Sequence, residues 1–214
     1  QMQMIFQDPF ASLNPRMTVG ETIAEPMVVH RIVEKTDALD KSIEILKKVG
    51  LTPDYASRYP HELSGGQRQR IGIARALAHE PNLIIADEAV SALDVSIQAQ
   101  VVNLMMELQE EFGLSYLFIS HDMAVIERVC HRVAVMYLGE IVEVGTRRQV
   151  FENPKHPYTK KLMKAVPIAD PKLRKKELNL MTDEIPSLIK PIGYEPEKID
   201  LIKIEDDHFI KPFN

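Results

Sequence analysis

Two short runs of apolar residues, one on each side of a long helical pattern, constrain the fold of this chain more than any other feature. The runs are LIIA at 83–86 and YLFI at 116–119, and unbroken hydrophobicity of this kind is typical of parallel strands covered on both faces. Between them, apolar side chains recur at helical spacing over 97–112, with Asp94 as the predicted N-cap and Gly113 as the predicted end. Strand, helix and strand in this order predict a βαβ unit and therefore an α/β fold.

Weaker patterns extend this fold on both sides. QMQMIF at 1–6 is predicted to be a strand, and because it starts abruptly without an initiating methionine, we expect the chain to be a piece of a longer protein. From Pro167 onward, 6 of the 14 prolines stand among many lysines and acids, so this region is predicted to be a loosely packed extension. Helices are predicted at 19–31, 36–49, 64–80, 146–152 and 158–165, and a hairpin around Gly139 at 132–144.

Composition narrows the classes of function. The formal net charge of −5 has the wrong sign for a dedicated binder of nucleic-acid backbones. The single cysteine, Cys130, excludes an internal disulfide and any CxxC metal site, and it suits a reducing cytosol. No run of about 18 apolar residues is present, so no membrane-spanning segment is predicted.

Polar residues stand where each of the two apolar runs ends. Asp87 and Glu88 follow the first run, and His121 lies in the SHD sequence that follows the second. Ligands of open α/β sheets bind beyond the carboxyl ends of the strands, where a carboxylate can hold Mg²⁺, a second can activate water, and an imidazole can contact a phosphoryl group. The alternative is that these residues only cap the following helices. Their arrival at one edge favours the catalytic interpretation.

The stretch HELSGGQRQRIGIARAL at 61–77 combines two adjacent glycines with a basic, helix-forming segment. N–H groups at the start of a helix form an anion site. Its three closely spaced arginines leave three readings open: nucleic acid, a nucleotide phosphate, or a solvated helix face.

Five short motifs occur in a fixed order. They are MIFQDP at 4–9, LSGGQ at 63–67, LIIADE at 83–88, SALD at 91–94 and SHD at 120–122. These resemble the Q-loop, signature, Walker B, D-loop and H-switch of ATP-binding cassette (ABC) ATPases, and the resemblance covers roughly residues 2–168. It implies a partial P-loop NTPase core with a mainly parallel sheet, a helical subdomain and a C-terminal extension. The implied segments are 1–8 for the core strand and Q-loop, 9–80 for the helical subdomain, 81–150 for the ATPase core and 151–214 for the extension.

Neighbouring sequence narrows the group. IFQDPFASLNPRMTVGETIAEP, ADEAVSALDVSIQAQV and YLGEIVEVGTRRQVFENPKHPYTKKLMKAVP are similar to the ATP-binding subunits of dipeptide, oligopeptide and glutathione importers. Ala89 stands where most members have proline, and the tail of the chain lacks clustered cysteines. With these two features, the sequence is most similar to the glutathione importers. Dipeptide, oligopeptide, glutathione and nickel are separated as solutes by resemblance alone.

The resemblance implies roles in catalysis for four residues. Glu88 would be the general base, and His121 would contact the γ-phosphate of ATP. Asp87 would hold Mg²⁺ through water. Gln7 would contact Mg²⁺ or the attacking water and relay the nucleotide state to the membrane subunits.

The resemblance also implies roles in nucleotide binding. Ser64, Gly65, Gly66 and Gln67 would bind the γ-phosphate of ATP at a helix N-terminus. Asp94 would bridge two protomers and help to position water, and it could serve as an N-cap at the same time.

A P-loop, G-x-x-x-x-G-K-[ST], does not occur, since none of the nine glycines is followed by lysine. We expect this motif and an adenine-stacking aromatic residue to precede Gln1 in a longer protein. The isolated chain is therefore predicted not to bind or hydrolyse ATP by itself.

The implied partners are a second ATP-binding cassette, identical or different, two membrane permease subunits and, indirectly, a periplasmic or extracellular solute-binding protein. No nucleic-acid partner is expected. The implied location is peripheral, at the cytoplasmic face of the inner membrane. Two alternatives remain open: a non-transport ABC ATPase acting on nucleic acid or ribosomes, and a non-catalytic module that donates its signature to ATP held by a partner.

Overall fold

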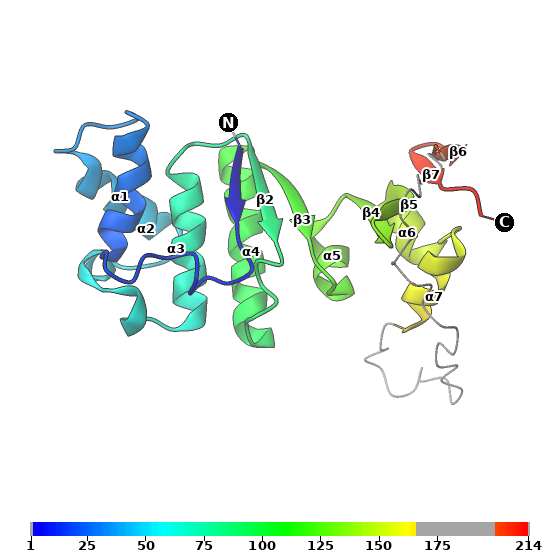
Figure 1. Cartoon of the computed structure of the whole chain (residues 1–214), viewed down its shortest axis with the longest axis horizontal. Coiled ribbons are helices and arrows are strands. Elements are labelled where there is room, and N and C mark those ends of the chain that lie inside the picture. The colour runs from blue at the N-terminus through cyan, green and yellow to red at the C-terminus, as the bar shows by residue number, and fades with distance from the viewer. Residues whose placement is uncertain (1, 166–199, 214) are drawn as a thin grey trace, which may run out of the picture. The chain divides into compact units, whose positions relative to one another are not determined.

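The computed structural model describes residues 2–165 and 200–213, which belong to two compact units, Gln1–Val129 and Cys130–Asn214 (Figure 1). The elements of the first unit are β1 (Met2–Ile5), α1 (Val19–Val29), α2 (Ala38–Lys48), the 3-10 turns η1 (Pro53–Ser57) and η2 (Pro60–Glu62), α3 (Gly65–Leu77), β2 (Leu83–Asp87), α4 (Val95–Phe112), β3 (Ser115–Ile119) and α5 (Met123–Val129). Those of the second unit are β4 (Arg132–Tyr137), β5 (Glu140–Thr146), α6 (Arg147–Glu152), α7 (Pro157–Ala165), β6 (Ile202–Glu205) and β7 (His208–Ile210).

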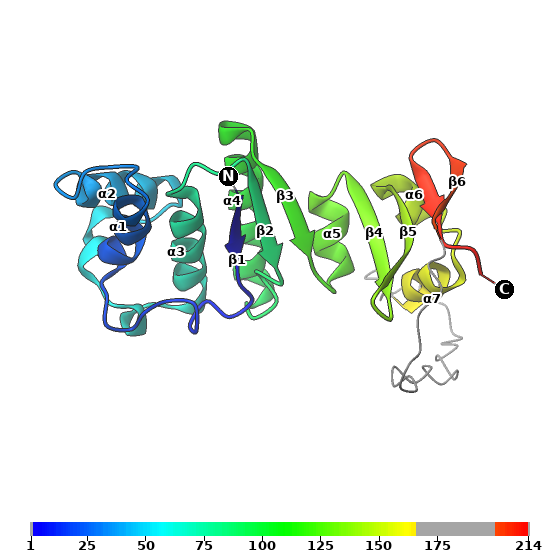
Figure 2. The ribbon, with the colours of Figure 1, turned by 45° about the horizontal axis from the view of Figure 1, so that its top comes forward.

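The first unit contains a three-stranded parallel sheet in the order β1-β2-β3. Its register places Met4 beside Ile85, and Ile85 beside Leu117; Figure 2 shows the three strands side by side. Because α4 follows β2 and leads into β3, the predicted βαβ unit is confirmed. Asp94 is the N-cap of α4, and Gly113 ends the helix in the left-handed conformation at φ 62°, both as predicted.

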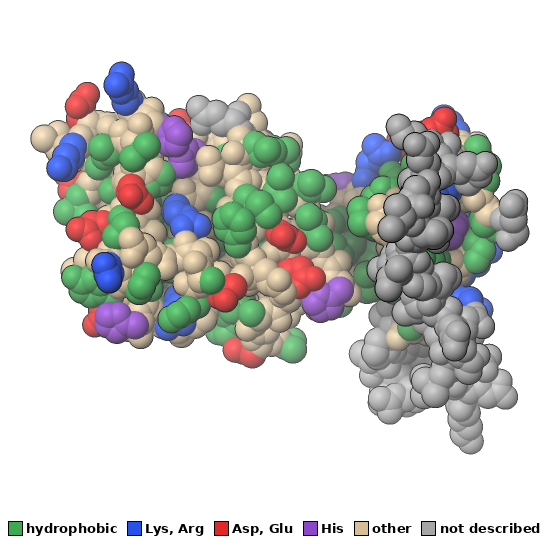
Figure 3. All heavy atoms as spheres, viewed as in Figure 1, with side chains coloured by type: hydrophobic (Ala, Val, Ile, Leu, Met, Phe, Trp, Pro, Cys, Tyr) green, Lys and Arg blue, Asp and Glu red, His purple; other side chains and the backbone are tan. Residues whose placement is uncertain are grey.

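The two faces of this sheet differ. Ile84 and Ala86 of β2 are fully buried in a core that also contains side chains of α3 and α4. On the opposite face, Met2 is 60% exposed and Leu117 is 51% exposed, and Figure 3 shows hydrophobic side chains gathered over these strands. The apolar runs thus predicted the strands correctly. Within the described part of the first unit, the sheet is covered on one face, whereas such runs usually occur in sheets that are covered on both faces.

The helices α1, α2 and α3 pack together around Ile23, Leu46 and Ile71, which are all fully buried. The capping box that begins α1 is formed by Thr18 with a glutamate three residues later. Gly50 follows α2 at φ 73°, which places glycine at the helix end, as predicted. These contacts build a helical layer that carries the N-terminus of α3.

The second unit is built on a four-stranded antiparallel sheet in the order β4-β5-β7-β6. The predicted hairpin around Gly139 is confirmed as β4 and β5. The prediction of a loosely packed extension from Pro167 onward is wrong for residues 200–213, because β7 pairs with β5 and fully buries His208. The part of that prediction at 167–199 lies outside the described residues.

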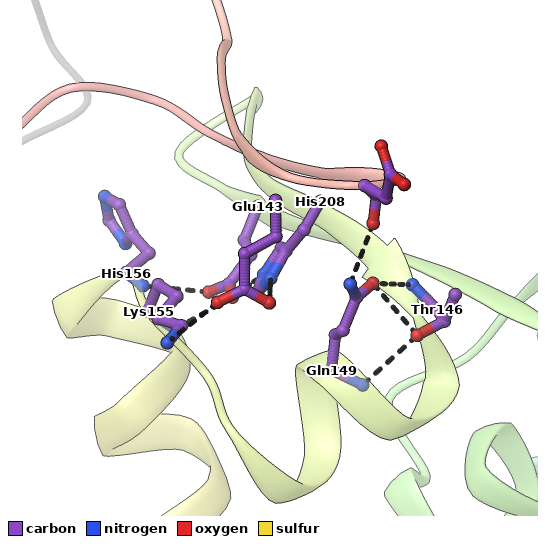
Figure 4. A network of polar contacts seen from close by, with 8 residues as sticks. Glu143, Thr146, Gln149, Lys155, His156 and His208 are labelled. Carbon is purple, nitrogen blue, oxygen red and sulfur yellow. Dashed lines mark hydrogen bonds and ion pairs between the residues drawn. The ribbon is translucent and has the colours of Figure 1, made fainter.

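A buried polar network holds β7 against β5. Glu143 of β5 and His208 of β7 are both fully buried, and Oε1 of the glutamate lies 2.7 Å from Nε2 of the histidine. The same carboxylate accepts the backbone N–H groups of Lys155 and His156, each at 2.9 Å, as Figure 4 shows. This network explains why residues so late in the chain join the sheet.

No helix among residues 2–165 and 200–213 is both long and apolar enough to cross a membrane. The finer division into segments at 1–8, 9–80, 81–150 and 151–214 stays a prediction.

Candidate active site

Three of the predicted site residues meet at the carboxyl end of the parallel sheet. Gln7 follows β1, Glu88 follows β2 and His121 follows β3. The Nε2 of Gln7 donates to Oε2 of Glu88 at 2.7 Å, and Nδ1 of His121 lies 3.2 Å from Oε1 of Glu88. The side chains of Glu88 and His121 are 29% and 71% exposed. An amide, a carboxylate and an imidazole from three strands are thus assembled within reach of water.

The backbone of Glu88 is held in an unusual conformation. Its φ of 45° lies in the left-handed region, which costs a residue with a Cβ about 1–3 kcal/mol. Two sets of hydrogen bonds maintain it. The Glu88 N–H donates to the carbonyl of Ile119 at 2.9 Å, and the Glu88 carbonyl accepts the N–H and the hydroxyl of Ser91 at 3.1 and 2.9 Å. The strained turn directs the carboxylate toward the ends of β1 and β3.

Two aspartates, Asp87 and Asp122, lie beside this cluster. Asp87 is the last residue of β2 and is half-buried. Asp122 accepts the N–H groups of Ala124 and Val125 through Oδ1 at 2.9 and 3.3 Å, and its Oδ2 accepts Nε2 of Gln98 on α4 at 2.8 Å. Asp122 therefore caps the start of α5, as the alternative interpretation of the strand ends expects for such residues.

The signature turn, residues 63–67, begins α3 with a capping box. Ser64 is the N-cap: its Oγ accepts the N–H of Gln67 at 3.3 Å, and its own N–H donates to Oε1 of Gln67 at 2.9 Å. The N–H groups of Gly65 and Gly66 lie between these two in the first turn and take no part in the box. Since the first four N–H groups of a helix have no partner within it, this turn offers two N–H groups and a hydroxyl to an anion.

Gly66 is also required by packing. A Cβ at this position would lie 2.3 Å from Cγ2 of Ile97 on α4, closer than real contacts of this kind. The close approach of α3 to α4 therefore demands glycine at this position, whatever ligand the turn binds.

The arginines of α3 tie the helix to neighbouring loops. Arg68 donates to the carbonyl of Pro60 at 2.8 Å, and Arg70 donates to that of Val49 at 2.8 Å. Arg75 donates to the carbonyl of a third loop residue, Ser12, at 2.5 Å. Because each guanidinium donates to a backbone carbonyl, these arginines hold α3 against its neighbouring loops, and the nucleic-acid reading is disfavoured.

Asp94 lies at the N-terminus of α4, where its Oδ1 accepts the N–H of Ile97 at 3.0 Å. The N-cap prediction is therefore confirmed, and the predicted bridge to a second protomer stays a prediction.

Within the described residues, no hydrogen bond or ion pair joins the signature turn to Gln7, Glu88 or His121. The structure thus brings the predicted site residues together in two groups.

Comparison with known proteins identifies the family. Residues 1–91 match the family model described as ABC transporter, and residues 142–193 match the one described as Oligopeptide/dipeptide transporter, C-terminal region. The glutathione import ATP-binding proteins GsiA of Pectobacterium atrosepticum and of Escherichia coli K12 are 61% and 57% identical over 209 residues, or 98% of this chain. The chain belongs to the ABC transporter family. It spans about a third of the length of these relatives, 34% of each.

Solved ABC structures are similar in fold. The protein cbiO1 from Clostridium perfringens, part of the ABC transporter complex cbiONQ, matches with a TM-score of 0.64 and 27% identity over 71% of this chain and 59% of its own. The ATP-binding cassette MJ0796, in a dimeric post-hydrolysis state bound to ADP and Pi, matches with a TM-score of 0.60 and 30% identity over 69% of this chain and 63% of its own. The parallel sheet and its helices are therefore those of an ABC cassette.

The ABC family implies ATP as the ligand, and the chemistry of both groups of residues fits that molecule. The signature turn presents N–H and O–H donors to an anion. At the sheet edge, Asp87 and Gln7 supply oxygen atoms, which Mg²⁺ prefers and commonly supplements with substrate phosphate and water. Among the described residues, no group of three or more His, Cys, Asp and Glu that could hold a metal occurs.

Two residues beside the site were not identified from the sequence. Gln98 joins α4 to Asp122, 24 positions away, and the hydroxyl of Tyr55 accepts Nε2 of Gln67 at 2.9 Å from 12 positions away. A helical projection of α4 could have placed Gln98 one turn after Asp94. For Tyr55 no periodic pattern exists, because it lies in the 3-10 turn η1.

Proposed function

We propose that this chain is the ATP-binding and ATP-hydrolysing part of an ABC importer for glutathione or peptides. The observation that carries the proposal is the contact of Gln7 and His121 with the two carboxylate oxygens of Glu88 at one sheet edge. The ABC family match and the two GsiA relatives support the same assignment.

Glu88 is suited to act as the general base. Its carboxylate is partly exposed, so a water molecule can reach it, and the strained backbone fixes its direction. The base takes a proton from this water while the water oxygen forms a bond to the γ-phosphorus of ATP and the bond to the bridging oxygen breaks, giving ADP and phosphate. Gln7 orients the carboxylate, and His121 contacts the γ-phosphate.

The signature turn binds the γ-phosphate of an ATP molecule whose other contacts come from a second cassette. Ser64, Gly65, Gly66 and Gln67 form the binding group in this assignment, since a helix N-terminus with exposed N–H groups favours an anion. Asp94, at the start of the neighbouring helix α4, contacts the second cassette while it caps that helix. This arrangement accounts for the separation of the predicted residues into two groups.

Mg²⁺ is the metal ion that this function requires. Asp87, through water, and Gln7 would hold it, and when bound it neutralises charge on the phosphates. The position of Asp87 as the last residue of β2, next to Glu88, supports this assignment.

Glutathione is the proposed solute, with dipeptides or oligopeptides as the related possibility, because the relatives are named for glutathione import and residues 142–193 match an oligopeptide/dipeptide transporter region. The proposed partners are a second cassette, two permease subunits and an extracytoplasmic solute-binding protein. The proposed location is the cytoplasmic face of the membrane.

A hybrid protein tests this proposal. In the hybrid, the 209 matched residues of the Pectobacterium atrosepticum relative are replaced by those of this chain. We expect the purified hybrid to hydrolyse ATP only when Mg²⁺ is present, and cells lacking their own GsiA but carrying the hybrid and its membrane partners to take up labelled glutathione. A folded hybrid without ATP hydrolysis would refute the enzymatic proposal. Hydrolysis with uptake of a dipeptide and not of glutathione would correct the solute.

A further inference from the structure

The signature turn depends on the orientation of one amide group. In its capping box, Oε1 of Gln67 must face the N–H of Ser64, at 2.9 Å. An amide carries an oxygen at one position and an NH₂ group of almost the same size at the other. If the Gln67 amide turned over, its NH₂ group would face the Ser64 N–H, and the box would be lost. Something must therefore hold the amide in one orientation.

Tyr55 provides that constraint. Its hydroxyl oxygen accepts Nε2 of Gln67 at 2.9 Å, so the NH₂ end of the amide has its own acceptor and the oxygen end is left for Ser64. The contact is partly buried, where an unpaired donor costs more than it does in water.

The capping boxes of α1 and α6 allow a comparison. The box of α1 pairs Thr18 with Glu21, whose carboxylate oxygens are equivalent and need no orienting partner. The box of α6 pairs Thr146 with Gln149, whose Nε2 donates to the carbonyl of Asp206 at 2.9 Å; Figure 4 shows Gln149 bonded on both sides. Both glutamine boxes thus have a second anchor. In the signature turn this anchor is a side chain, and a substitution can remove it.

Tyr55 is itself held in place from its other side. The guanidinium of Arg58 lies over its ring at 4.1 Å from the centroid, and Arg58 is paired with Asp54 at 2.6 Å. The ring packs against the core of the first unit. Tyr55, Ser64 and Gln67 line the same open cavity of about 360 Å³. The hydroxyl is therefore fixed beside the turn that it supports.

We propose that Tyr55 is a positioning residue for the nucleotide-binding signature turn, acting through Gln67 without touching ATP. When the box is intact, the Ser64 hydroxyl receives the N–H of Gln67 and keeps its own proton to donate to a phosphate oxygen. Loss of the Tyr55 hydroxyl releases the amide, and the donors of the turn lose their shared direction. This inference rests on the proposed function, because it assigns the turn to ATP.

The test is the substitution Tyr55→Phe in the hybrid defined above, with two readouts. Hydrogen exchange over residues 61–68, measured by mass spectrometry, should become about fivefold faster, as expected for the loss of one hydrogen bond. The kcat/KM for ATP should fall by about fivefold to tenfold for the same reason. Tyr158→Phe is the matched control: it deletes a tyrosine hydroxyl in the second unit, where the ring stacks on Tyr137, and it should change neither value.

A second substitution separates positioning from general stability. Gln67→Glu replaces the amide by a carboxylate, which needs no orienting partner, as in the Thr18–Glu21 box. Whatever the effect of this change alone, adding Tyr55→Phe to it should have no further effect on kcat/KM. A merely structural role of Tyr55 would lower activity equally in both backgrounds.

Each outcome decides between the claims. Faster exchange with lower kcat/KM, and no added effect in the Gln67→Glu background, supports the proposal. Unchanged exchange in Tyr55→Phe, or faster exchange with unchanged kcat/KM, overturns it while the unmodified hybrid still hydrolyses ATP. An unmodified hybrid without ATP hydrolysis refutes the proposed function, and the role of Tyr55 in nucleotide binding is refuted with it.

Discussion

The glutamate–histidine pair of the first unit, Glu88 with His121, and that of the second unit, Glu143 with His208, differ in almost every physical respect. Glu88 and His121 lie 3.2 Å apart with side chains 29% and 71% exposed. Glu143 and His208 lie 2.7 Å apart, and neither is exposed to solvent. The same two residue types thus form an open pair in the first unit and a closed pair in the second. The comparison shows that residue type does not separate a reactive carboxylate from a structural one.

What separates them is the use of the carboxylate oxygens. Glu143 accepts two backbone N–H groups, those of Lys155 and His156, as well as the imidazole of His208. Burial acts to raise the pKa of Glu143, but the N–H of Lys155, the hydroxyl of Thr159, His208 and the N–H of His156 outweigh it, so its pKa is lowered. This carboxylate is charged and fully occupied by protein, and no water can be activated there.

Glu88 has the opposite arrangement. One oxygen accepts Gln7, and the other faces the exposed imidazole of His121. The strained φ of Glu88 costs stability, whereas the network around Glu143 contributes to it. Strain at a position that is open to water is typical of functional sites.

Removal of the closed carboxylate should have the largest effect on stability. Glu143→Ala leaves His208 and two backbone N–H groups buried without their acceptor, so we expect a loss of about 3–5 kcal/mol. Chemical denaturation of the second unit measures this value. Glu140→Ala on the same strand is the matched control: the Glu140 side chain is 48% exposed where it pairs with Lys211, and its loss should cost less than about 1 kcal/mol. Equal losses for the two variants would contradict the assignment of Glu143.

The closed pair should also make stability depend on pH. The pKa of Glu143 lies below its ordinary value of 4.5 in the folded protein, so the carboxylate adds stability above that value and loses it as pH falls through the folded pKa. The difference in unfolding free energy between the unmodified protein and Glu143→Gln should therefore shrink as pH is lowered below 4.5. A constant difference across this range would show that the charge on Glu143 contributes nothing.

Asp94 should show a smaller change in stability than Glu143, and it combines a structural role as a helix cap with a proposed function. Asp94→Ala removes the N-cap bond to Ile97, for an expected loss of about 1 kcal/mol, whereas Asp94→Asn keeps a capping oxygen and should stay near the unmodified value. If the proposed contact with a second cassette needs the charge, both variants lower ATP hydrolysis. Full activity in Asp94→Asn would restrict this residue to capping.

The sequence could predict the first unit better than the second. The βαβ unit followed from two apolar runs and from the capping residues Asp94 and Gly113, which are local signals. The pairing of β7 with β5 was missed because a three-residue strand in a charged segment has no local pattern, and its partner Glu143 lies 65 positions from His208. For such contacts, burial is a property of the folded chain and not of the segment.

The candidate site divides in the same way. The strand ends placed Glu88 and His121 at one edge, because parallel strands share their carboxyl ends. The positive φ of Glu88 and the hydroxyl of Tyr55 could not be foreseen, since each depends on hydrogen bonds to residues far along the chain. The packing of Gly66 against Ile97 was hidden for a similar reason: the motif explains the glycine by its ligand alone, and the second helix is not part of it.

The most direct measurement is the single-turnover rate of ATP hydrolysis by the Glu88→Gln variant of the hybrid, together with its ATP affinity and its unfolding free energy. If Glu88 is the open, reactive carboxylate, hydrolysis falls by about 10²- to 10⁴-fold, as expected for removal of a general base, while ATP still binds and stability changes by less than about 0.5 kcal/mol. Hydrolysis at an undiminished rate would contradict the account. So would a loss of stability like that expected for Glu143, because Glu88 would then be structural.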